Sequence, residues 1–137
     1  PFCGYNMADY FGHWLDMGKK MSNPPKVFSV NWFRQDEAGK FIWPGFGDNI
    51  RVLKWIIDRA NGSVSAKETP VGLVPEISDL NMEGLNISRD YMEKLFEVNA
   101  GEWSAETADF EKFAAQFGGR MPDGINQELS KLKKNLS

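Results

Sequence analysis

Five stretches of the chain repeat apolar residues at three- and four-residue intervals, the spacing that gathers side chains on one face of an α-helix. Asp48 or Asn49 is placed to cap the second helix, and Asn61-Gly62 supplies its stop. Ser88, Ser104 and Pro122 mark the starts of the last three. The expected helices are therefore 7–21, 50–60, one capped by Ser88, one capped by Ser104 and one after Pro122.

Between the first two helices the pattern changes to β-branched and aromatic residues. Residues 26–33 and 40–43 have this character and flank a polar turn at 35–39, which predicts a β-hairpin. Residues 63–87 hold no period and are interrupted by proline and glycine, which predicts a connecting loop. The fold class expected is α+β, mostly helical with a small β-hairpin or sheet.

Composition places the chain among soluble domains, with 42% hydrophobic and 26% charged residues in 137. No stretch approaches about 18 consecutive apolar residues, so no membrane span is expected. The net charge of −3 argues against nucleic acid as a partner, because phosphate-binding proteins usually gather lysine and arginine on one face. Cys3 is the single cysteine, which favours a reducing compartment and a cytoplasmic location.

The densest chemical signal lies at 31–49, where five large aromatic residues occur in nineteen. Rings on two adjacent strands can enclose a slot for a flat purine, and stacking of a base on an aromatic ring contributes about 1–3 kcal/mol. Stacking does not distinguish guanine from adenine, so the Asn49 amide and backbone groups near Gly45 and Gly47 are the candidates for reading the purine edge. The alternative is that these rings form an ordinary hydrophobic core.

The run Phe-Ile-Trp-Pro-Gly-Phe-Gly-Asp-Asn at 41–49 resembles the base-binding segment of GTP-dependent phosphoenolpyruvate carboxykinases. The resemblance includes the flanking residues 30–34 and 51–55 and extends to 1–6 and 66–72. It implies that the chain is a C-terminal fragment of such an enzyme, and that its fold is part of a larger α/β nucleotide-binding domain. Within that fragment we expect a guanine-pocket segment at 1–62, the connecting loop at 63–87 and C-terminal helices at 88–137, together one incomplete domain.

The resemblance also implies the activity. Members of the family convert oxaloacetate and GTP to phosphoenolpyruvate, GDP and carbon dioxide in gluconeogenesis, with a divalent metal that is typically manganese. Carried over position by position, the guanine-binding residues are Phe33, Phe41 and Phe46 with Trp32 alongside, followed by Gly47, Asp48 and Asn49.

Other parts of the catalytic apparatus are not visible in the sequence. No Gly-Lys-Ser or Gly-Lys-Thr occurs, and His13, the single histidine, has no ligand partner at metal-binding spacing. Arg34 lies beside a turn and Arg51 on a helix face, where arginines are usually solvated or ion-paired, so neither is expected to contact phosphate. In the family the phosphate loop, metal ligands and mobile lid precede the position of Pro1, so we expect no catalytic residue and no metal ligand here, and no activity from this chain alone.

We expect the whole enzyme to be a monomer and the isolated fragment to self-associate through apolar surface left uncovered. Two further readings are open from the residues alone. One is a free-standing aromatic interaction module without catalysis. The other is a single-stranded nucleic-acid binder, which the acidic charge balance disfavours.

Overall fold

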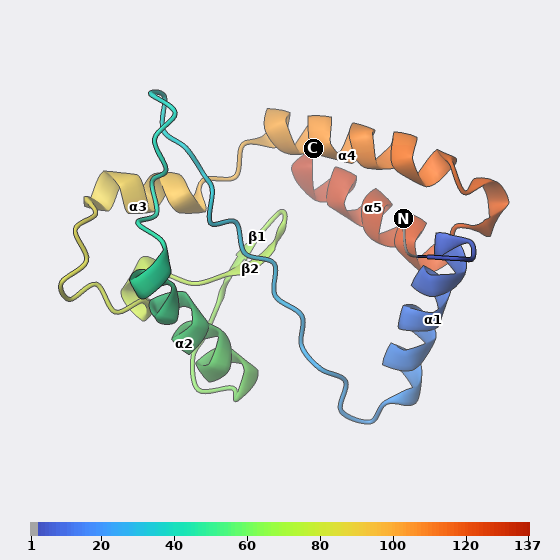
Figure 1. The fold of residues 1–137 in the computed structure, drawn as a ribbon, viewed down its shortest axis with the longest axis horizontal. Helices are drawn as coiled ribbons and strands as arrows, with labels where there is room; N and C mark the ends of the chain where they lie inside the picture. The colour runs from blue at the N-terminus through green and yellow to red at the C-terminus, as the bar shows by residue number, and fades with distance from the viewer. Residues whose placement is uncertain (1–2) are drawn as a thin grey trace. The chain divides into compact units, whose positions relative to one another are not determined.

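The computed structural model describes residues 3–137 and separates the chain into two compact units, drawn as a ribbon in Figure 1. The first unit joins the stretch up to Pro25 with Val98–Ser137, and the second is Lys26–Glu97. The helices are α1 (Met7–Lys20), α2 (Asn49–Ala60), α3 (Arg89–Phe96), α4 (Ala100–Ala115) and α5 (Asp123–Leu136), and the strands are β1 (Lys67–Thr69) and β2 (Gly72–Val74). Among the helices within 3–137, none is both long and apolar enough to span a bilayer.

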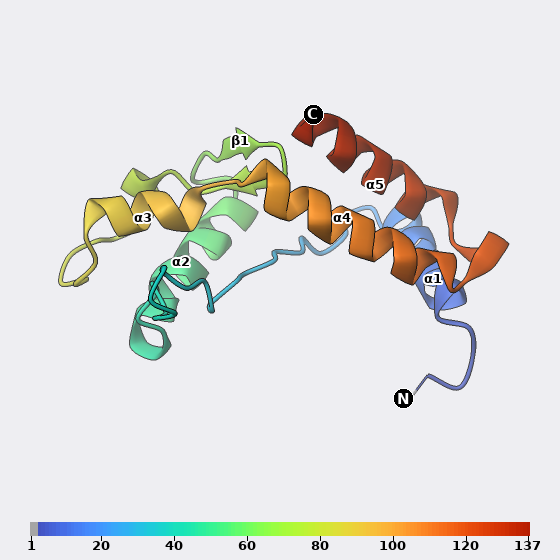
Figure 2. The ribbon, with the colours of Figure 1, turned by 90° about the horizontal axis from the view of Figure 1, so that it is seen from above.

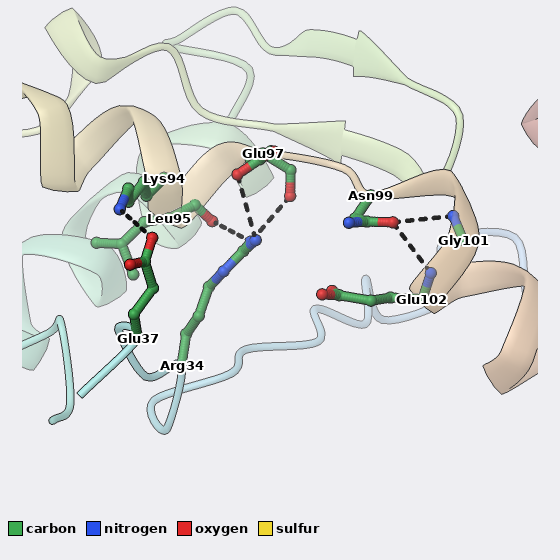
Figure 3. A network of polar contacts seen from close by, with 8 residues as sticks. All are labelled: Arg34, Glu37, Lys94, Leu95, Glu97, Asn99, Gly101 and Glu102. Atoms are coloured by element: carbon green, nitrogen blue, oxygen red, sulfur yellow. Dashed lines mark hydrogen bonds and ion pairs between the residues drawn. The ribbon is translucent and has the colours of Figure 1, made fainter. Parts of the chain in front are cut away.

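The first unit contains α1, α4 and α5. The Asn6 side chain caps α1 by accepting from the Ala8 amide at 2.9 Å. Asn99 caps α4 by accepting from the Gly101 and Glu102 amides, as Figure 3 shows. The prediction that Ser104 caps this helix was wrong, because Ser104 lies inside α4, where its hydroxyl donates to the Ala100 carbonyl oxygen.

Helices α4 and α5 lie side by side in both Figure 1 and Figure 2. Within this unit, α1 packs near the end of α4 through the Phe11 ring, which meets the Phe117 ring edge-on with the ring centroids 6.0 Å apart. Arg120 donates to the Asp9 carboxylate at 2.7 Å. A side chain at Gly124 would lie 3.0 Å from the Leu15 side chain, so glycine there permits the close approach of α5 to α1.

The second unit holds the hydrophobic core. Four of its residues are almost fully buried, and Met92 on α3 is the most buried of all. The Phe28 ring packs edge-on against Trp55 at 6.1 Å, which brings the extended stretch before residue 34 onto α2. The core residues are Trp43, Trp55, Leu80 and Met92. Apolar burial of this kind stabilises a fold by about 25 cal/mol per Å² removed from water.

The β-hairpin of this unit lies elsewhere than the sequence predicted. Strands β1 and β2 pair antiparallel through Lys67↔Val74, Glu68↔Leu73 and Thr69↔Gly72, inside the stretch expected to be a loop. Within 26–43 the described backbone forms only one isolated bridge, Gln35↔Phe41. The regular strands predicted there do not form within the described residues. The predicted turn at 35–39 does form, and the Asp36 and Ile42 amides donate across it to the Lys40 and Arg34 carbonyl oxygens, both at 2.9 Å. The fold class of helices with one small hairpin is confirmed.

Candidate functional site

The aromatic segment is shaped by hydrogen bonds from side chains to its own backbone. The Asn31 side chain accepts from the Phe33 amide at 2.9 Å. The Asp36 carboxylate accepts from the amides of Ala38 and Lys40, both at 3.0 Å, and closes a tight turn. Around this turn the Asp36 and Ile42 amides donate to the Lys40 and Arg34 carbonyl oxygens, so pairing is limited to the few residues next to the turn. The Asn31 bond competes with a longer strand ladder before it.

The turn brings Phe33 and Phe41 together outside the core. Their ring centroids lie 5.7 Å apart with planes at 61°, an edge-type arrangement that aromatic pairs prefer. Both rings are exposed, Phe33 at 69% and Phe41 at 51% of their surface. The site therefore presents a pair of accessible ring surfaces to solvent.

Phe46 is presented by an unusual backbone. Its φ angle is +31°, the one positive value among the described non-glycine residues, and it follows Gly45 at φ +80°. Residues other than glycine adopt positive φ at a cost of about 1–3 kcal/mol. The ring gains no burial in return, since it is 99% exposed. At that exposure it does not pack against the Phe33 and Phe41 rings, so the structure does not close a slot around a base.

Trp32, Trp43 and Asn49 form a second group on the core side of the segment. Trp32 is half-buried, and its ring lies 6.5 Å from that of Trp43. Trp43 is buried, and its indole Nε1–H donates to Asn49 Oδ1 at 2.8 Å. Asn49 is the first residue of α2, so this bond connects the aromatic segment to the start of a helix.

Gly47 and Asp48 complete the predicted residues. Asp48 accepts from Arg51 Nε at 2.9 Å, and the Arg51 guanidinium also donates to the carbonyl oxygens of Asn81 and Glu83. Asp48 thus helps to orient an arginine that holds a loop. Gly47 is exposed, with no atom within 4 Å of where a side chain would begin.

Arg34 anchors the segment to the end of α3, as Figure 3 shows. Its guanidinium donates to the carbonyl oxygens of Glu97 at 2.8 Å and Leu95 at 3.4 Å. The last carbonyls of a helix lack partners within the helix, so a cation placed there satisfies them. The interpretation of both arginines as ion-paired is confirmed, since Arg34 also lies 3.9 Å from the Glu97 carboxylate.

Electrostatics at the turn favour the ionised form of one carboxylate. The backbone N–H of Lys40, followed by that of Ala38 and the Tyr91 hydroxyl, lowers the pKa of Asp36 below its ordinary value of 3.8. Within residues 3–137 the structure groups no three His, Cys, Asp or Glu side chains as a metal site would require.

Sequence reasoning missed the part played by Trp43. It was counted among the aromatic residues but not among the site residues, because its contact with Asn49 depends on packing. The available signal was a tryptophan close in sequence to an asparagine at an expected helix start, since a buried indole N–H usually needs an acceptor.

Comparison with known proteins identifies the kind of domain. The family described as phosphoenolpyruvate carboxykinase C-terminal P-loop domain matches residues 1–135. The phosphoenolpyruvate carboxykinase (GTP) of Chlamydia caviae is 48% identical over 138 residues, which is 99% of this chain and 23% of that protein. That of Chlamydia muridarum is 49% identical over 137 residues, and that of Treponema pallidum is 45% identical over 140 residues, again with 23% of each relative covered.

These matches define a nucleotide-dependent carboxykinase domain. The chain belongs to the phosphoenolpyruvate carboxykinase (GTP) family, and it corresponds to part of the family's C-terminal domain. The chain spans 23% of the length of the relatives it matches.

Proposed function

We propose that this chain supplies the guanine-binding surface of a GTP-dependent phosphoenolpyruvate carboxykinase. The whole protein converts oxaloacetate and GTP to phosphoenolpyruvate, GDP and carbon dioxide, in the cytoplasm and as a step of gluconeogenesis. The observation that carries the proposal is Phe46, which combines a strained backbone with a fully exposed ring. Strain without a gain in packing is typical of positions kept for binding.

The division of labour follows from the residues in hand. Phe33, Phe41 and Phe46 offer π-faces to a base, and Asn49 offers an amide to its edge. The described residues contain no metal cluster, and the sequence contains no Gly-Lys-Ser or Gly-Lys-Thr. The phosphate cradle and the manganese ligands are therefore proposed to come from parts of the protein outside this chain, which on its own is inactive. The monomeric state of the whole enzyme and self-association of the isolated chain remain predictions.

Substitutions in the full-length enzyme test the base site. Phe46→Ala should lower kcat/KM for GTP about 10-fold or more, because it removes a stacking face worth about 1–3 kcal/mol. Asn49→Ala should relax the preference for guanine and hypoxanthine nucleotides over adenine nucleotides. The assay is formation of phosphoenolpyruvate from oxaloacetate with GTP, ITP or ATP as phosphoryl donor.

The matched control is Trp14→Ala, since Trp14 is another exposed ring but lies on α1 in the other unit. KM for oxaloacetate provides an internal reference within each variant. Nucleotide kinetics that stay at wild-type values in both site variants would exclude the proposed guanine surface.

A further inference from the structure

The bond between Trp43 and Asn49 fixes which end of an amide faces a ligand. Trp43 is 6% exposed, and its indole nitrogen can donate but not accept a hydrogen bond. The atom of Asn49 at 2.8 Å must therefore be the amide oxygen. Asn49 consequently keeps the two N–H donors of Nδ2 on its other side.

Without this partner the amide would have no fixed orientation. The terminal torsion of asparagine is broad and roughly two-fold, so oxygen and nitrogen exchange places at small cost. The backbone N–H of Asn49 is committed to the Phe46 carbonyl oxygen, which anchors the main chain at this position. The hydrogen bond from the Trp43 indole N–H then fixes the terminal torsion of the Asn49 side chain.

The orientation has a chemical consequence for a purine. Guanine and hypoxanthine carry an oxygen acceptor at C6, whereas adenine carries an amino donor there. An amide held with its N–H groups outward complements the oxygen and opposes the amino group. If the amide could rotate by half a turn, its oxygen could accept from the amino group of adenine, and the site would discriminate poorly between adenine and guanine.

We propose that Trp43 is a positioning residue for base selectivity, which it confers by locking Asn49 as a hydrogen-bond donor to purines with an oxygen at C6. This inference rests on the proposed function and assigns to the same site the source of its preference for guanine and hypoxanthine over adenine. Trp43 itself touches no base in this account. It acts only through Asn49.

The test uses the full-length enzyme and the ratio of kcat/KM with GTP to kcat/KM with ATP. Trp43→Phe keeps an apolar ring and removes the N–H, so the ratio should fall about 10-fold, which corresponds to one unmatched hydrogen bond at the base. The ITP-to-ATP ratio should fall in parallel, because hypoxanthine retains the oxygen at C6. The change should appear in KM for the nucleotide.

Trp55→Phe is the matched control. Trp55 is a second buried indole of the same core, and among the described residues its Nε1 has no hydrogen-bond partner. Its replacement removes a similar ring but no bond to Asn49, so the GTP-to-ATP ratio should remain at the wild-type value. Incorporation of benzothienylalanine at position 43 replaces the N–H by sulfur at nearly constant shape, and it decides the question if Trp43→Phe does not fold.

The outcomes separate the two proposals. If Trp43 acts through Asn49, adding Trp43→Phe to Asn49→Ala changes the ratio no further. Suppose that Asn49→Ala lowers the GTP-to-ATP ratio but loss of the N–H at position 43 does not. That result would overturn the positioning role of Trp43 and would leave the proposed guanine-binding surface intact. If Asn49→Ala itself leaves the GTP-to-ATP ratio unchanged, Asn49 does not contact the purine edge, and the positioning role of Trp43 is overturned as well.

Discussion

Two sets of aromatic residues within Lys26–Glu97 have opposite relations to water. Trp43 and Trp55 are buried in the core with Met92, whereas Phe33, Phe41 and Phe46 expose half or more of their surface. Apolar area buried on folding contributes to stability, but exposed rings contribute little and add to the risk of association. The first set therefore maintains the fold, and the second is available to a flat ligand.

The boundary between the sets lies within three residues. Trp43 is buried and Phe46 is fully exposed, and Pro44 and Gly45 stand between them. Gly45 has φ +80° and ψ −165°, a combination that is essentially restricted to glycine. This reversal allows adjacent rings to point into different environments, so hydrophobicity alone cannot assign them.

The largest predicted effect concerns the buried set. Trp55→Ala should destabilise the full-length protein by about 3–5 kcal/mol, because a large side chain leaves a cavity in the core. Phe46→Ala should change the free energy of unfolding by less than about 0.5 kcal/mol, as is usual for surface substitutions. Urea midpoints for both variants test the contrast, and equal losses of stability would remove the distinction between the two sets.

A smaller effect of opposite sign is expected from the strained position. Phe46→Gly relieves about 1–2 kcal/mol of backbone strain and loses about 0.5–1 kcal/mol through the greater freedom of glycine in the unfolded chain. We expect the protein to become more stable by about 0.5–1 kcal/mol while its kcat/KM for GTP falls. The matched control is Phe33→Gly, where an exposed ring sits on ordinary backbone and the same change should reduce stability. A stability loss in both variants would contradict stored strain at Phe46.

The smallest effect concerns the turn that holds Phe33 beside Phe41. The pKa of Asp36 is lowered by backbone N–H donors, first that of Lys40, so its ionised form stabilises the folded turn above the unfolded-state pKa. That contribution disappears as the pH falls through the lower folded-state pKa. Between about pH 5 and about pH 3 the wild type should lose slightly more stability than Asp36→Asn. Urea midpoints at both pH values test this, and parallel changes would argue against a role for the carboxylate.

The helices were largely predictable from the sequence. The bounds expected for α1 and α2 lie within one residue of the observed ends. Helices α3 and α5 begin directly after Ser88 and Pro122, where their starts were expected. The Ser88 cap is confirmed, since its hydroxyl accepts from the Tyr91 amide. These features depend on residues close in sequence, which explains why a local pattern was enough.

The strands were not predictable in the same way. Residues 26–33 have high β-propensity, but that propensity reflects packing on a sheet surface, and here the chain bends at Asn31, whose side chain accepts from the Phe33 amide. The turn predicted at 35–39 does form, around Asp36. The observed hairpin had a weaker signal in Thr69-Pro70-Val71-Gly72, with proline at the second turn position and glycine at the fourth. Its turn is closed by the Thr69 hydroxyl, which donates to the Gly72 carbonyl oxygen at 2.7 Å.

The candidate site was predictable as a set of residue types but not as an arrangement. Phe33 and Phe41 meet as an exposed pair, yet Trp32 faces Trp43 on the core side. Asp48 was expected to take part in nucleotide binding, and its observed partner is Arg51. These roles depend on contacts between separate elements, which spacing along the chain does not encode.

The Arg34 anchor also bears on the order in which the protein takes shape during synthesis. Its acceptors at Leu95 and Glu97 lie 61 and 63 residues further along the chain. At roughly 5–20 residues per second, a ribosome needs about 3–13 s to add that length. Nascent chains should therefore lack the Arg34 anchor until α3 has emerged, so the turn that carries Phe33 and Phe41 becomes fixed to the rest of its unit late in synthesis.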